Sequence, residues 1–337
     1  MSQVMTNEVF ARLYVQAGVG HFRENRFREA LAFFDAALRY NPDDDYARYN
    51  RASVLLSMGD YARGFPEHDV AWRLFQWRGF GPVREDIDKL SVLPVWRGEH
   101  HVSVLVYHEL GFGDAIMVMR YLPELKRRAE VTLLVDPCLA RLARGFDVEV
   151  VEKVPNDLRE YDYRLPFFGV MSALGETVET IPAEPYIRVP LPVRDDRRNL
   201  GIAWSGRTQT MFTAERFLSL LQHEGFRIHA LQPGPAPDGI EPLRPGSDFA
   251  DVADRMAAMD HIVTVDTAAA HLAGAIGHSS VHLLLPFMSD WRWWHASAWY
   301  PRITTYRQPQ PGDDWRTPFA QINATLKEPA TKGEIDG

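Results

Sequence analysis

Apolar, small and aromatic residues recur at helical spacing through the first part of the chain. Counted in a 34-residue unit that starts at Ala11, these residues fall at positions where two antiparallel helices would pack closely, and a proline then stops the second helix. The residues are Tyr14, Gly18, Phe27, Ala30, Phe34, Ala37 and Pro42. A second unit from Asp45 repeats the pattern more weakly, through Ala52, Gly59, Tyr61, Gly64 and Ala71. The pattern predicts helix pairs over residues 8–80.

This spacing is typical of tetratricopeptide repeats, and an ordinary helical hairpin is the alternative. Two repeats bury too little surface to be stable alone, because about three are normally needed. We therefore expect residues 65–80, which carry Trp72, Phe75 and Trp77, to continue as helix and to dock on the next domain of the chain.

After a connector at 81–100, short β-rich runs alternate with helical segments. Strands are predicted at 102–108, 131–136 and 148–152, with a further apolar run at 164–170, and helices at 114–128 and 137–144. Beyond a proline-rich linker, strands are predicted at 200–205, 228–232, 262–266 and 281–286, and helices at 214–223, 249–259 and 268–276. Such alternation indicates parallel sheets covered by helices on both faces.

The predicted organisation is therefore α/β, with two halves facing a cleft. The helical repeats occupy 8–80, the connector 81–100, the halves 101–192 and 193–325, and a tail 326–337. Because the first half is small, we expect the repeats to complete its core rather than to hang from it.

Composition and charge narrow the class of protein. The formal net charge of −8 at pH 7 argues against nucleic acid as a partner. Cys138 is the only cysteine, which excludes an intramolecular disulfide and fits a reducing compartment. Neither a signal-peptide pattern nor a run of about 18 uncharged apolar residues is present, so no integral membrane segment and a cytoplasmic location are expected.

Ligands of open parallel sheets bind beyond the carboxyl ends of the strands, which makes the turns after the predicted strands the candidate sites. The first turn runs from His108 to Asp114 and contains glycines that allow close backbone approach to an anion. Together with Asp136 it approaches a dinucleotide-binding fingerprint, although Ile116 occupies the third glycine position. A plain glycine turn is the alternative.

Two further turns lie after strands of the second half. Ser205, Gly206 and Arg207 could hold phosphate oxygens through hydroxyl, backbone and guanidinium donors. Gln232, followed by Pro233 and Gly234, could contact a base. Taken alone, each is better explained as a structural turn.

The densest group of candidate residues lies at 265–275. A predicted strand ends at Asp266, and Thr267 caps a helix of small residues that begins at Ala268, so its positive end suits a pyrophosphate. His271 lies one helical turn after Thr267 and could face the same ligand. A core histidine with one hydrogen bond is the alternative.

Metal binding is not predicted, because the close histidine groups at 100–101 and 278–282 lack carboxylates at ligand spacing. A group of aromatic residues at 291–300 could stack on a sugar, but packing in a core is the commoner use of such side chains.

Taken in order, these segments resemble bacterial tetratricopeptide-repeat glycosyltransferases related to glycosyltransferase family 9, the heptosyltransferases. The resemblance spans about residues 10–315 and is carried by the repeats and by residues 108–116, 201–206, 265–275, 284–286, 290–293, 299–301, 307–308 and 312–313. It implies a GT-B fold of two Rossmann-like halves, with a nucleoside-diphosphate sugar bound mainly by the C-terminal half and the acceptor mainly by the N-terminal half.

The resemblance also implies inverting transfer without a metal or other cofactor. Asp114 would be the general base that accepts the proton of the acceptor hydroxyl. Donor or phosphate contacts would come from Gly111, Gly113, Trp204, Ser205, Gly206, Arg207, Gln232, Asp266, Thr267, Ala268 and His271. Sugar or acceptor contacts would come from Glu109, Asp290 and Trp291. A protein or glycan acceptor would dock through the repeats, and a homo-oligomer would fit the same picture.

The chain departs from these relatives at two donor positions. Thr210 and Met211 stand where they carry Arg-Ser, and Pro233 stands where they often carry Lys. The missing positive charge would then come from Arg207, Arg216 or Arg244. The alternatives are a degenerate transferase that acts as a binding scaffold and, less favoured, a dinucleotide-dependent enzyme built on 111–136.

Overall fold

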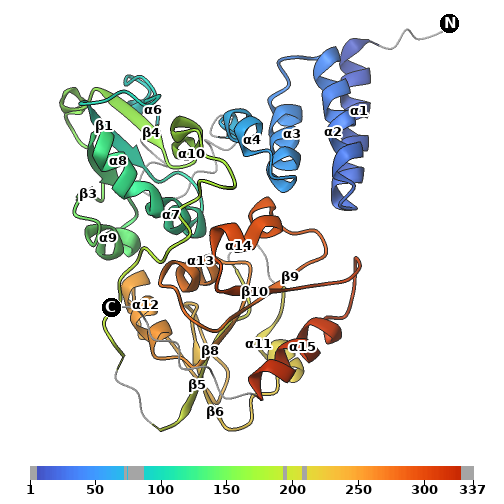
Figure 1. The fold of residues 1–337 in the computed structure, drawn as a ribbon, viewed down its shortest axis with the longest axis vertical. Helices are drawn as coiled ribbons and strands as arrows, with labels where there is room; N and C mark the ends of the chain where they lie inside the picture. Colours follow the sequence, from blue (N-terminus) through green and yellow to red (C-terminus); the bar gives the residue numbers. More distant parts are fainter. Residues whose placement is uncertain (1–5, 72–73, 75–86, 193–195, 207–210, 328–337) are drawn as a thin grey trace, which may run out of the picture.

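The computed structural model describes residues 6–71, 74, 87–192, 196–206 and 211–327 (Figure 1). It begins with two pairs of helices, the blue elements of Figure 1, with the bounds α1 Asn7–Arg23, α2 Phe27–Tyr40, α3 Asp45–Ser57 and α4 Tyr61–His68. Close helix approach depends on glycine: a Cβ on Gly18 would lie 2.7 Å from the ring of Phe34, and one on Gly64 would lie 2.6 Å from Leu56. Half of the helix predicted at 65–80 lies outside the described residues.

The N-terminal half holds a four-stranded parallel sheet in the order β3-β2-β1-β4. Its elements are α6 Ile87–Leu90, β1 Ser103–Tyr107, α7 Phe112–Val118, α8 Leu122–Arg128, β2 Glu130–Leu134, α9 Pro137–Arg144, β3 Glu149–Val151, β4 Tyr163–Pro166 and α10 Gly169–Leu174. The single helix predicted at 114–128 is wrong. A 3-10 turn at Met119–Tyr121 separates α7 from α8, and Pro123 in the first turn of α8 lacks the N–H that a continuous helix needs.

The C-terminal half holds a six-stranded parallel sheet in the order β10-β9-β8-β5-β6-β7. Its strands are β5 Arg198–Ala203, β6 Phe226–Ala230, β7 Ile240–Glu241, β8 His261–Val265, β9 Val281–Leu285 and β10 Ile303–Arg307. Its helices are α11 Ala214–Leu220, α12 Phe249–Ala257, α13 Ala268–Ala275, α14 Ala296–Trp299 and α15 Arg316–Leu326, with the 3-10 helix η4 at Trp291–His295. The parallel sheets and their helices confirm the predicted α/β class.

In both sheets the chain adds strands outward on one side of the first strand and then returns to add the rest on its other side. The chain moves outward from β1 through β2 and β3 and then returns to place β4 on the other side of β1. In the second sheet it moves outward from β5 through β6 and β7, and β8 to β10 lie on the other side. A crevice opens at the carboxyl ends of the strands beside such a switch point, so β1/β4 and β5/β8 mark where ligands should bind.

The N-terminal helices pack on both halves. Leu56, Tyr61 and Phe65 belong to one buried cluster that also contains residues of β1, α7, α13 and η4. The Nε1–H of Trp299 donates to the hydroxyl of Tyr61 at 2.8 Å, and His295 Nε2 lies 3.2 Å from the carbonyl oxygen of Ser57. We expected the repeats to support the first half, and the structure shows that the second half supports them as well.

A buried arginine joins the two halves directly. Arg120, from the N-terminal half, donates to the carbonyl oxygens of Trp299 at 2.8 Å and Pro182 at 3.1 Å. Its guanidinium lies 4.6–4.9 Å from the ring centres of Tyr186, Trp299 and Tyr300. No helix within the described ranges is both long and apolar enough to cross a membrane.

Replacing Tyr61 by Phe should lower the free energy of unfolding by about 1–3 kcal/mol, because the Nε1–H of Trp299 would stay buried without its acceptor. Urea unfolding of the variant and the parent chain measures the difference. Tyr46→Phe is the matched control: that side chain is 52% exposed, so its loss of a hydroxyl should change the value by less than about 0.5 kcal/mol. Equal effects of the two substitutions would contradict the docking contact.

Candidate functional site

The carboxyl ends of the two sheets lie against each other through α7 and α13 (Figure 1). A Cβ on Gly113 would come within 2.7 Å of the ring of His271 and 3.5 Å of the Cα of Ala268. Glycine is therefore required at position 113 for the first turns of the two helices to touch. The structure thus brings together the two predicted segments that lie farthest apart in the sequence, 108–114 and 265–275.

Asp114 is held from both halves of the protein. One carboxylate oxygen, Oδ2, accepts the backbone N–H of Gly111 at 3.0 Å, which caps α7. The other, Oδ1, forms an ion pair with the guanidinium of Arg292 in η4. The predicted general base is therefore fixed at one oxygen by its own half and at the other by the opposite half.

Arg292 is the centre of a buried charge cluster. Its side chain is only 10% exposed, and besides Asp114 it pairs with Asp290 at 2.6 Å. Its guanidinium lies 4.5 Å from the ring centre of Trp291 and 5.3 Å from that of Phe168. Burial alone would lower the pKa of Arg292, but the carboxylates of Asp290 and Asp114 outweigh it and raise that pKa. The guanidinium is charged at any physiological pH.

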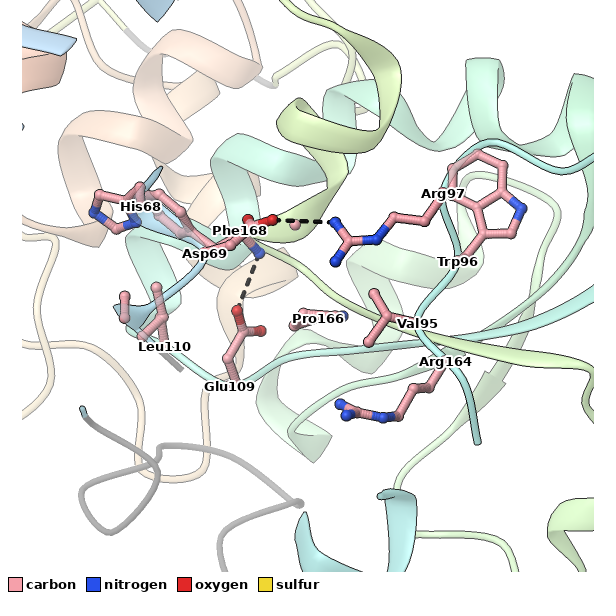
Figure 2. Close-up of a pocket in the computed structure, with 12 residues that line it drawn as sticks. His68, Asp69, Val95, Trp96, Arg97, Glu109, Leu110, Arg164, Pro166 and Phe168 are labelled. Atoms are coloured by element: carbon pink, nitrogen blue, oxygen red, sulfur yellow. Dashed lines mark hydrogen bonds and ion pairs between the residues drawn. The ribbon is translucent and has the colours of Figure 1, made fainter. Parts of the chain in front are cut away.

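Glu109 closes the switch point of the first sheet. Its carboxylate accepts the backbone N–H groups of Phe167 at 2.9 Å and Phe168 at 3.0 Å, which ties the end of β1 to the end of β4 (Figure 2). Burial raises the pKa of Glu109 to about 8, against the two N–H groups that lower it. Glu109 is 4% exposed and binds backbone N–H groups in this structure, and its contact with a sugar or acceptor stays a prediction.

A small pocket lies beside Glu109, between the end of α4, the connector and the end of β4 (Figure 2). His68 and Asp69 line one side, and Asp69 pairs with Arg97 at 3.4 Å. Burial raises the pKa of Asp69 to about 6, although Arg97 lowers it. The cavity of about 40 Å³ has room for a few water molecules and not for a sugar ring.

On the opposite side, Asp266 and Thr267 lie directly after β8. Thr267 caps α13, its hydroxyl accepting the N–H of Ala269 at 3.3 Å; Ala268, the first residue of the helix, is half-buried, and Ala269 and Ala270 are buried. Burial raises the pKa of Asp266 to about 7; the charge of Asp290 adds to this, and the charge of Arg292 opposes it. An N–H-rich helix end therefore stands next to the charge cluster.

His271 is an interface residue in this structure. Its side chain is 5% exposed, its Nδ1 lies 2.9 Å from the hydroxyl of Tyr300, and its ring lies 4.9 Å from that of Trp293. Burial lowers the pKa of His271 well below its ordinary value, so the ring is neutral. The predicted role in orienting a phosphate has no support here, because the ring is covered by α7 and bonded to Tyr300.

Gln232 holds the turn after β5. Its amide oxygen accepts the N–H groups of Trp204 at 2.7 Å and Ser205 at 3.0 Å, and its nitrogen donates to the Ser205 hydroxyl at 3.1 Å. Both the oxygen and the nitrogen of the Gln232 amide are therefore used inside the protein, and its contact with a base stays a prediction. Trp204 is likewise a core residue, whereas Ser205 and Gly206 are half-buried. Arg207 lies outside the described residues.

Trp291 also proves to be a core residue. It packs edge-on against Tyr61, Phe65, Phe168 and Trp299 where the repeats meet the two halves. Trp291 therefore takes part in core packing in this structure, and its contact with a sugar or acceptor stays a prediction. Asp290 remains half-buried and pairs with Arg292.

Sequence reasoning assigned no role to Arg292 or Arg307. Arg307, at the end of β10, donates to the Ser289 hydroxyl and to the carbonyl oxygen of Trp293, and burial lowers its pKa to about 10. The only feature of the sequence that pointed to Arg292 was its place in the short motif at 290–293.

The described residues contain no group of three or more His, Cys, Asp or Glu side chains placed to hold a metal. Asp136 accepts the N–H of Cys138 and caps α9.

His68 offers a test of the buried site through pH. Burial lowers the pKa of His68 to about 3, and the charge of Arg292 lowers it further, whereas the unfolded chain takes up the proton near pH 6.5. The unfolded state then binds more protons, so the free energy of unfolding falls as pH drops from 6.5 toward 3. Urea unfolding at pH 7.5 and at pH 5 checks this. Between these two pH values, the free energy of unfolding of His68→Gln should fall by about 2 kcal/mol less than that of the parent chain. Parallel pH curves for the two proteins would contradict the burial of a neutral ring.

No protein-family model matches the chain. Among curated proteins it is similar to Protein FlbA of Caulobacter vibrioides, with 22% identity. The alignment is 386 positions long and covers 97% of this chain and 61% of that protein. The chain therefore spans less than two thirds of that relative's length.

Among solved structures, the chain is similar to the ADP-heptose lipopolysaccharide heptosyltransferase II of E. coli. The TM-score is 0.50 at 13% identity, and the match covers 67% of this chain and 98% of that one. A glycosyltransferase family 9 structure from Veillonella parvula gives a TM-score of 0.43 at 10% identity over 70% of this chain and 94% of that one. The first match shows that the two parallel sheets are arranged as in a GT-B glycosyltransferase.

Proposed function

We propose that this protein is a glycosyltransferase that moves a sugar from a nucleoside diphosphate to a hydroxyl group. The observation that carries the proposal is the placement of Asp114. This carboxylate stands at the carboxyl end of the first sheet, and the helix that carries it touches the first turn of α13 at the carboxyl end of the second. A base and an anion-binding helix end at facing switch points are what sugar transfer from a diphosphate requires.

In the proposed reaction the donor diphosphate lies at the first turn of α13, near Thr267 and Ala268, with Ser205 and Gly206 on the turn across from it. Asp114 accepts the proton of the acceptor hydroxyl while the hydroxyl oxygen bonds to the anomeric carbon and the bond to the diphosphate breaks. A single displacement inverts that carbon. The leaving diphosphate is stabilised by backbone N–H groups and the helix end, so the reaction needs no metal.

The N-terminal helices are proposed to be tetratricopeptide repeats, and the whole chain a relative of glycosyltransferase family 9. Support comes from the close approaches at Gly18 and Gly64, which fall at the repeat's small positions. A groove between α2 and α3, lined by Leu38, Arg39 and Arg48 among others, offers a surface for a protein or glycan acceptor. Self-association and a cytoplasmic location remain predictions from the sequence.

Asp114→Asn tests the proposed chemistry. Transfer or donor hydrolysis should fall by about 10²–10⁴-fold, because the base is lost while the shape of the site stays the same. Affinity for the nucleoside diphosphate, measured by calorimetry, should change little, since the diphosphate contacts are elsewhere. Asp157→Asn, at an exposed carboxylate paired with Arg159, is the matched control and should keep full activity.

A screen of nucleotide sugars by calorimetry and by donor hydrolysis decides whether the proposal stands. Absence of both binding and hydrolysis with every donor would overturn it. Binding without turnover, unaffected by Asp114→Asn, would instead support the scaffold alternative.

A further inference from the structure

We infer that Arg292 is the positioning residue for the base Asp114, so that the base is correctly oriented only while the two halves and the repeats are docked together. This inference rests on the proposed function. It assigns Arg292 to the carboxylate of Asp114 and not to the donor phosphates.

The Asp114 side chain is only partly fixed by its own helix. The bond from the Gly111 N–H reaches only Oδ2, and it comes from the same helix end as Asp114 itself. One bond to one oxygen leaves the carboxylate free to swing about that contact. The ion pair with Arg292 at Oδ1 removes this freedom, and each oxygen keeps a second lone pair that can accept a proton.

Arg292 is itself held rigidly. Asp290 Oδ1 accepts from both its guanidinium, at 2.6 Å, and its backbone N–H, at 3.1 Å. The rings of Trp291 and Phe168 lie over the guanidinium. Among the described residues, its buried Nε has no hydrogen-bond partner, so the side chain is directed by its two terminal nitrogens. A planar guanidinium presents two separate nitrogens at a fixed spacing, one to each carboxylate, whereas an ammonium group is a single point charge on a flexible stem.

The contact between Asp114 and Arg292 depends on distant parts of the chain. Glu109 fixes the backbone of Phe168, whose ring covers Arg292, so the support from the first half depends on a buried carboxylate. On the other side, η4 carries Arg292 and packs against α3 of the repeats, where His295 meets the carbonyl of Ser57. The orientation of one carboxylate therefore depends on all three parts of the protein.

The charges explain why removing Arg292 would move Asp114. Asp114 and Asp290 both pair with Arg292, and the charges of both raise the pKa of nearby Asp266 while that of Arg292 lowers it. Without the guanidinium, neighbouring carboxylates would repel one another in a largely buried place. Asp114 would turn away from its position, and a misplacement of about 1 Å can cost about 10²-fold in rate.

The experiment compares Arg292→Gln and Arg292→Lys with the parent chain in transfer or donor-hydrolysis assays. Arg292→Gln should lower kcat by about 10²-fold and leave KM for the nucleotide sugar within about threefold. Arg292→Lys should recover part of the loss, and added guanidinium ion should partly restore Arg292→Gln. Arg302→Gln, an exposed arginine that donates to the Gly277 carbonyl, is the matched control and should behave as the parent.

Two outcomes would overturn the inference. A rise in KM with unchanged kcat would assign Arg292 to donor binding, and equal loss in both Arg292 variants without rescue by guanidinium would reduce it to a structural residue. If the parent shows no turnover with any donor, the proposed function fails first. The contact between Asp114 and Arg292 is then tested by unfolding Asp114→Asn, Arg292→Gln and the double variant. A coupling of about tenfold in the unfolding equilibrium constant supports the contact, and additive effects of the two substitutions refute it.

Discussion

The structure depends on keeping one positive charge buried at the point where three parts of the protein meet. Removing a guanidinium from water costs several kcal/mol, and only well-placed carboxylates and hydrogen bonds offset this. For Arg292 those carboxylates come from opposite halves, Asp114 from the first and Asp290 from the second. Separating the halves would leave Asp114 and Arg292 without each other, so their electrostatics favour the docked arrangement.

Arg120 applies the same constraint a short distance away. It bonds to the carbonyls of Met117 and Pro182 in its own half and of Trp299 in the second half, and it lies among three aromatic rings, so this cation is satisfied by both halves together. Between the two arginines, the contact of Gly113 with His271 leaves no space for a side chain. The interface is thus specified by charge and by close approach together, and both requirements fall on single residues.

Much of the fold could be predicted because its signals are local. Buried strands such as β8 and β9 appear as continuous apolar runs, and α9 lies where its pattern placed it. The edge strand β10 escaped prediction because two of its five residues, Thr304 and Thr305, face solvent and break that run. In the candidate site, the sequence marked the turns correctly but not what their side chains do. Gln232 and Glu109 have the chemistry of ligand contacts, and only the fold shows that backbone N–H groups use it.

The docking of the repeats on η4 and α14 has a consequence for synthesis of the chain. Tyr61 and its partner Trp299 are 238 residues apart. At about 5–20 residues per second, a ribosome needs roughly 10–50 seconds to make the intervening chain. For that time the apolar side of α3 and α4 has left the ribosome but lacks the surface that covers it. These N-terminal helices are therefore synthesised early but reach their full packing only after the C-terminal half has been made.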